Sequence, residues 1–118
     1  MAKILVVFES NFDNQQHMLD ALDFTMASTG YAHQTSALFS GSGVNLLAAP
    51  NDKNSRQKSP AKIIASFPFY DIDDLYVCSD SLVAFNNNNT VYTDLDIIEV
   101  NSSQIDELIA QHDHVARF

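Results

Sequence analysis

The amino-acid sequence predicts a three-layer α/β/α sandwich built on a mainly parallel sheet of about five strands. Short apolar segments alternate along the chain with longer amphipathic ones, which is the pattern of parallel strands joined by crossover helices. The first apolar segment, residues 3–8, is continuous, as expected of a strand buried on both faces. The 118 residues suit one domain, residues 1–118, and contain no internal repeat.

The first helix and the second strand are expected next. Residues 14–29 carry methionine and leucine side chains at helical spacing, and Gly30 suits the C-terminal end of this helix. Residues 33–39 are expected to form the second strand. Gly41 then opens a short helix, and Pro50 marks its end.

The middle of the chain is expected to add a helix and a strand. A serine followed by Pro60 predicts a helix start, with the serine as its cap, and this helix should stop before Pro68. Residues 75–78, Leu-Tyr-Val-Cys, are the expected third strand. Residues 79–85 are expected to continue as a short helix or a turn.

The last part of the chain predicts a strand, a helix and a strand. Residues 95–100 are the fourth strand, and residues 103–106, Ser-Gln-Ile-Asp, match a capping box at the start of the last helix. Residues 114–118 form a short final strand. Because functional crevices in such folds lie at the carboxyl ends of the strands, three segments are candidates for the site: 9–14, 40–43 and 78–81.

The charge balance narrows the range of partners that the sequence allows. The chain has 15 acidic and 6 basic residues and a formal net charge of -9. Such a surface repels phosphate, so direct binding of RNA or DNA is not expected. No apolar run approaches the ~20 residues that span a bilayer, and no signal peptide is recognised, so we expect a cytoplasmic protein without a membrane partner. The single cysteine, Cys78, suits a reducing compartment.

Four motifs, taken together, resemble the TusC (DsrF-like) family of sulfur-relay subunits. Residues 70–82, Tyr-Asp-Ile-Asp-Asp-Leu-Tyr-Val-Cys-Ser-Asp-Ser-Leu, resemble the signature stretch of that family, and residues 114–118, His-Val-Ala-Arg-Phe, resemble its Arg-Phe terminus. Residues 19–22, Leu-Asp-Ala-Leu, and 43–47, Gly-Val-Asn-Leu-Leu, fall in register with it. The chain departs from the family pattern in the loop 9–14 and at Asn86, where the family usually has glycine.

The resemblance implies the DsrE/DsrF/DsrH-like fold and a role inside an assembly. It implies TusB-type and TusD-type partners in a heterohexamer, a dimer of heterotrimers that passes persulfide sulfur for the 2-thiolation of wobble uridine in tRNA. TusA-type and TusE-type proteins would act as sulfur donor and acceptor, and no cofactor is implied. A sister complex, DsrEFH, serves sulfur oxidation.

Cys78 is the candidate persulfide carrier. It ends the third strand where a short helix begins, and backbone amides there favour the thiolate that attacks a persulfide. Neighbouring aspartates, such as Asp74 and Asp80, act against the thiolate. The alternative is a buried cysteine that packs as a small apolar residue. The family resemblance favours this alternative, because its relay cysteine belongs to the TusD-type partner.

An aromatic cluster, Phe67, Phe69 and Tyr70 around Pro68, is the candidate interface. Aromatic residues are enriched at the centres of protein interfaces, and a subunit that must assemble needs such a surface. The same residues could equally form part of the core.

Two groups of residues suggest a metal at first sight, but no metal site is expected. Asp71, Asp73 and Asp74 precede their strand, whereas Glu9 follows its own, so the carboxylates do not converge. His112, Asp113 and His114 are two histidines around an aspartate without a further ligand in view.

The sequence leaves three functional hypotheses. The first is a supporting subunit of a sulfurtransferase complex, not catalytic by itself, beside a TusD-type carrier. The second is a direct persulfide carrier that uses Cys78. The third is a stand-alone flavodoxin-like module that binds a nucleotide or Mg²⁺.

Overall fold

A five-stranded sheet forms the centre of the molecule. The structure is a computed structural model that describes residues 2–9, 15–31, 34–47, 60–72, 74–85 and 97–118. Within these residues the strand order is β4-β3-β2-β1-β5, and every neighbouring pair is parallel. The strands are β1 (Lys3–Phe8), β2 (Gln34–Phe39), β3 (Asp74–Cys78), β4 (Ile97–Val100) and β5 (His114–Arg117). This sheet confirms the fold class predicted from the alternation of apolar and amphipathic segments.

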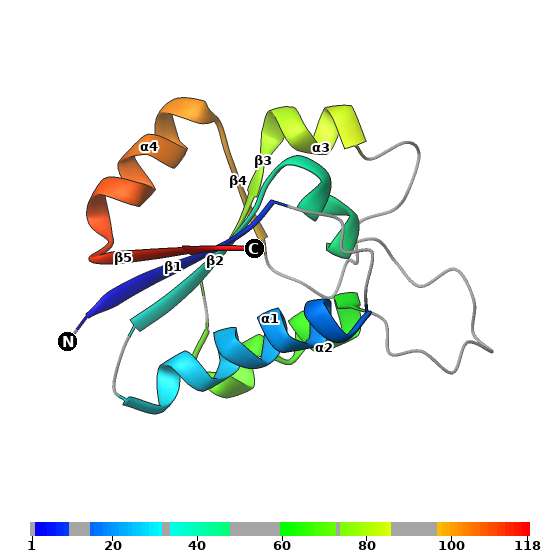
Figure 1. The fold of residues 1–118 in the computed structure, drawn as a ribbon. Helices are drawn as coiled ribbons and strands as arrows, with labels where there is room; N and C mark the ends of the chain where they lie inside the picture. Colours follow the sequence, from blue (N-terminus) through cyan, green and yellow to red (C-terminus); the bar gives the residue numbers. More distant parts are fainter. Residues whose placement is uncertain (1, 10–14, 32–33, 48–59, 73, 86–96) are drawn as a thin grey trace.

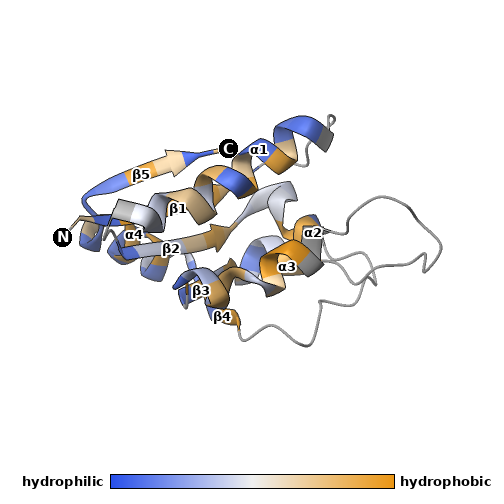
Figure 2. Cartoon of the chain, turned by 90° about the horizontal axis from the view of Figure 1, so that it is seen from below, coloured by the Kyte–Doolittle hydropathy of each residue, from blue (hydrophilic) through white to orange (hydrophobic). Residues whose placement is uncertain are grey.

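The helices lie on the two faces of this sheet. Helices α1 and α2 cover one face and α4 covers the opposite one, whereas α3 continues directly from the end of β3 (Figure 1). Three 3₁₀ helices, η1, η2 and η3, complete the described elements. Their bounds are α1 Gln15–Ala27, η1 Ser28–Tyr31, η2 Gly41–Leu47, α2 Pro60–Ala65, η3 Phe67–Tyr70, α3 Ser79–Phe85 and α4 Ser102–Gln111. Figure 2 shows hydrophilic and hydrophobic residues alternating along α1, as expected of a helix with one face on a sheet.

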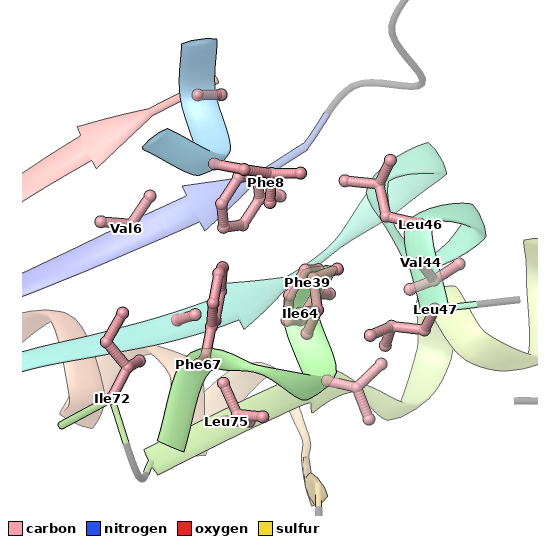
Figure 3. Close-up of a cluster of buried hydrophobic side chains, with 14 of the residues drawn as sticks. Val6, Phe8, Phe39, Val44, Leu46, Leu47, Ile64, Phe67, Ile72 and Leu75 are labelled. Carbon is pink, nitrogen blue, oxygen red and sulfur yellow. The ribbon is translucent and has the colours of Figure 1, made fainter. Parts of the chain in front are cut away.

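The larger core lies between the sheet and helices α1 and α2. Side chains that alternate along β1, β2 and β3 point to this face, and η2 closes the core at one end (Figure 3). Its largest members are aromatic: Phe8 and Phe39 stack with ring centroids 5.1 Å apart, and Phe67 lies below Phe8 and beside Phe39 in this view. Since a fully buried Phe side chain stabilises a fold by about 1.5–3 kcal/mol, these rings anchor α2 and η3 to the sheet.

The smaller core lies under α4. It contains Leu5 and Val7 of β1, Leu38 of β2, Val100 of β4 and Leu108 of α4. The other side chains packed against it are only partly buried: Tyr76, Ile105, Ile109 and Val115. Among the described helices, α4 contributes to this smaller core, whereas α1 and α2 contribute to the larger one.

The end of β5 is tied to β1. The Phe118 backbone N–H donates to the Val7 carbonyl at 2.9 Å, and the Glu9 backbone N–H donates to the Phe118 carbonyl at 2.8 Å. The Phe118 ring stacks on Phe8 and tilts against Phe24 of α1, with centroids 6.2 Å and 5.5 Å away. The Arg-Phe motif thus joins the final strand to the main core.

One local expectation was wrong. The predicted capping box at 103–106 lies too far along the chain, because the N-cap of α4 is Asn101. Its side chain accepts from the Gln104 N–H at 2.9 Å, and the Gln104 side chain accepts from the Asn101 N–H at 2.8 Å. The helix from Pro60 ends at Ala65, before Pro68 as predicted, and Pro68 itself lies inside η3, where a 3₁₀ turn tolerates it at the first or second position.

Candidate functional site

The three segments predicted as candidates for the site follow β1, β2 and β3 at the carboxyl ends of these strands. Hydrogen bonds join the three segments that follow these strands. The Gly41 N–H donates to the Ser81 hydroxyl at 2.8 Å, which links η2 to α3, and the Ser42 hydroxyl donates to the Glu9 carbonyl at 3.3 Å. Residues 10–14 of the predicted segments lie outside the described residues.

Two glycines let η2 approach the end of β1. A Cβ at Gly43 would lie 1.9 Å from the Phe8 carbonyl oxygen, so any side chain there would push η2 away from the strand. Gly41 has a φ of 55°, a left-handed conformation that other residues adopt only with strain. The Gly-Ser-Gly segment is therefore needed to pack η2 against β1.

Cys78 is the last residue of β3 and has only 8% of its surface exposed. It is paired in register with Val100 of β4, on the face of the sheet that α4 covers. Helix α3 begins at the next residue, Ser79, and carries Asp80 in its first turn. The free thiol is thus held at the edge of the site but is largely shielded from solvent.

Glu9 and Arg117 form an ion pair at the same edge of the sheet. Glu9 follows β1 and Arg117 ends the neighbouring β5, and both side chains are exposed. The pair could not be predicted from the sequence, because the register between residues distant in the chain cannot be read from either segment. A pair this exposed contributes little to stability, about 0–1 kcal/mol.

The structure separates the three residues of the aromatic cluster. Phe67 is fully buried in the larger core, whereas Phe69 is 89% exposed and Tyr70 is 48% exposed. The left-handed residue Asp71 ends η3 directly after them, with a φ of 65°. Phe67 therefore belongs to the core, and Phe69 and Tyr70 form an aromatic surface above it.

The acidic turn and the histidines do not come together as a metal site. Asp71 and Asp74 precede or begin β3, at the end of the sheet opposite Glu9, and Asp73 lies outside the described residues. The Asp113 carboxylate accepts from the Lys3 backbone N–H at 2.8 Å, and the His112 ring contacts the Leu108 carbonyl at 2.6 Å. In the described part of the chain, no group of three or more such side chains could hold a metal ion.

Burial raises the pKa of Tyr76, and the charge of Asp74 raises it further. The two residues lie two positions apart on β3, so their side chains share the α4 face. This shows that the carboxylate and the phenol are neighbours, although both are partly accessible. Asn86, the other departure from the TusC pattern, lies outside the described residues.

Comparison with known proteins agrees with this fold. The model of the DsrE/DsrF-like family matches residues 2–118, and the chain belongs to this family. It is 28% identical over 83 residues to a protein named "Protein TusC homolog" from Vibrio parahaemolyticus, which covers 70% of each chain. The crystal structure of the YchN protein from E. coli superposes over 100% of both chains with a TM-score of 0.76 at 10% identity, a likeness of fold alone. Among the described helices, none is long and apolar enough to cross a membrane.

Proposed function

We propose that this chain is a subunit of a cytoplasmic sulfur-relay complex, in which it assembles with TusB-type and TusD-type subunits. Its family and its similarity to a TusC homolog support the sulfur-relay role. The resemblance of residues 70–82 and 114–118 to TusC-type sequences supports the choice of partners. The complex would take persulfide sulfur from a TusA-type donor and pass it, through a TusE-type acceptor, to the 2-thiolation of tRNA wobble uridine.

The burial of Cys78 is the observation that favours a supporting role over a catalytic one. A thiol accepts sulfur only when the terminal sulfur of the donor persulfide can reach it. With 8% of its surface exposed, Cys78 offers little access to a donor protein. The chain would then stabilise the assembly and hold a TusD-type carrier in place.

The aromatic surface formed by Phe69 and Tyr70 is our proposed contact with one of these partners. Both rings are exposed on a short 3₁₀ helix that Phe67 anchors in the core beneath. A rigidly supported and exposed aromatic side chain loses little conformational entropy on binding, which suits an interface anchor. Phe67 would contribute by fixing this helix and not by touching the partner.

Co-expression tests this assignment. We expect the chain to elute with TusB-type and TusD-type proteins as one assembly in gel filtration. Phe69→Asp should release the chain from the assembly, whereas Val83→Asp, the same change at a side chain that is 86% exposed on α3, should not. Separate elution of the wild-type chain would contradict the proposed function, and an unaffected Phe69→Asp assembly would contradict this interface.

A second candidate function is direct sulfur transfer by Cys78, favoured by its position at the carboxyl edge of the sheet. The Cys78 thiolate would attack the terminal sulfur of a donor persulfide and form a new S–S bond. The S–S bond of the donor would break, and its electron pair would leave with the donor thiolate.

Mass spectrometry tests this second function. After incubation with a loaded TusA-type donor, a carrier gains one sulfur atom, and Cys78→Ser abolishes the gain. No gain on the wild-type chain, while a TusD-type protein in the same tube gains sulfur, would exclude direct transfer.

A further inference from the structure

On the face of the sheet that α4 covers, one side chain of β3 and one of β4 are not fully buried. Tyr76 and Ile98 are paired in register on these strands, and both side chains point to this face, as does the buried Val100 two residues after Ile98. Tyr76 is only partly buried at the margin of the smaller core, and Ile98 is 52% exposed. We call this pair the open strip. The exposed isoleucine and the exposed part of the tyrosine thus adjoin each other beside the smaller core.

The open strip lies in a part of the chain that is uniformly negative. Between residues 63 and 116 the sequence has ten of its 15 acidic residues and none of its 6 basic ones. Asp74 shares the face with Tyr76, close enough for its charge to act on the phenol, whereas the exposed Glu99 lies on the edge strand but points to the opposite face. Helix α4, which borders the strip, contributes the exposed Asp106 and Glu107.

This distribution of charge decides which kind of partner fits. A second copy of the chain would bring two acidic surfaces together, and like charges across an interface disfavour association. A partner with an apolar centre and lysine or arginine around it would bury the open strip and neutralise the surrounding carboxylates. The observations therefore favour a different chain over a second copy.

We propose that the open strip is the docking surface for a different protein chain, one that presents an apolar patch rimmed by lysine and arginine. This inference rests on the proposed function, because the partner would be a sibling subunit of the relay complex. It adds a second surface to the aromatic one on η3, so that the chain contacts two subunits by two distinct sites. The contact at the strip would weaken with added salt, because salt screens the attraction between its carboxylates and the lysine and arginine of the partner.

Ile98→Arg tests the proposal, with Val83→Arg as the matched control. Both substitutions add the same charge at an exposed apolar side chain, one inside the strip and one on α3. We expect Ile98→Arg to weaken binding of the co-purified TusB-type or TusD-type subunit by at least about tenfold, which corresponds to ~1.4 kcal/mol. Val83→Arg should bind like the wild-type chain, and circular dichroism should show both variants folded.

A second variant and the salt dependence of binding complete the test. Should Ile98→Arg fail to fold, Ile98→Thr keeps a β-branched residue in the strand and should weaken binding in the same direction. Wild-type binding that is indifferent to salt, or an equal loss of binding in Ile98→Arg and Val83→Arg, would overturn the proposal. A homodimer of the isolated chain that Ile98→Arg dissociates would overturn it in favour of a second copy.

The same binding experiment distinguishes a wrong docking surface from a wrong function. If the wild-type chain assembles with its siblings and Ile98→Arg assembles equally well, the open strip is not the docking surface, but the function stands. If the wild-type chain does not assemble at all, the proposed function fails, and the assignment of the partner fails with it.

Discussion

Side chains on the α1 and α2 face of the sheet lie in a closed core, whereas those on the α4 face reach solvent at β3 and β4. The first face buries Phe8, Phe39 and Phe67 completely. The second face ends at a half-exposed Ile98 beside a partly buried Tyr76. Burial on the first face accounts for the stability of the isolated fold, and incomplete burial on the second is where a partner is expected.

The largest expected loss of stability comes from a substitution in the core between the sheet and helices α1 and α2. Phe67→Ala removes a fully buried ring and should lower the free energy of unfolding by about 3–5 kcal/mol. Phe69→Ala, two residues away at an 89% exposed position, should change it by less than about 0.5 kcal/mol. Urea unfolding of the isolated chain measures both. Similar values for the two would show that the distinction between core and surface in η3 is wrong.

The next largest loss of stability is expected from a substitution that disturbs the packing of η2 on β1. Gly43→Ala places a Cβ against the Phe8 carbonyl and should destabilise the fold by about 3 kcal/mol. Gly30→Ala serves as its control, because nothing lies within 4 Å of the added Cβ and the backbone needs no left-handed angle. We expect this control to lie within ~1 kcal/mol of the wild-type protein in the same unfolding experiment. A harmless Gly43→Ala would contradict the close approach.

A smaller loss of stability is expected at the start of α4. Asn101→Ala removes the side chain that caps this helix and should cost about 1 kcal/mol. Ser103→Ala tests the cap that the sequence alone had suggested, and its effect should be close to zero. Thermal unfolding compares the two variants, and the opposite ranking would restore the predicted capping box.

The smallest expected effect is the pH dependence of the fold's stability that Tyr76 causes. Burial, and then the charge of Asp74, raise the pKa of Tyr76 above its usual value. The unfolded chain therefore loses this proton first as pH rises, and stability is lost from about pH 10 upward. Tyr76→Phe should lose less stability than the wild-type protein between about pH 9 and about pH 11. Parallel curves for the two proteins would mean that the phenol is freely solvated.

Much of the fold could be predicted from local patterns. The continuous apolar run of β1 and the Leu-Tyr-Val-Cys segment of β3 are short, β-rich and bounded by turn residues, so each appears in the sequence as a strand. The cap of α4 was misassigned because Ser103 and Asp106 match the capping pattern as well as Asn101 and Gln104 do. Only the direction in which the chain enters the helix distinguishes them.

The candidate site was less predictable. The carboxyl edge was expected from the fold class, but the contacts that shape it join residues far apart in the sequence, such as Gly41 with Ser81 and Glu9 with Arg117. The aromatic cluster could not be divided into core and surface before η3 was known, because a 3₁₀ turn after Ala65 rotates Phe69 and Tyr70 away from Phe67. The open strip depends on which half of the face α4 covers, and no local pattern encodes that.

The supporting role of this chain is tested most directly by sulfur transfer through a complex that contains Cys78→Ser. The TusB-type and TusD-type subunits are assembled with the wild-type chain, with Cys78→Ser or without the chain, and the persulfide sulfur reaching a TusE-type acceptor is measured. We predict wild-type transfer with the variant and loss of transfer when the chain is omitted. Loss of transfer with the variant in an intact assembly would contradict the supporting role.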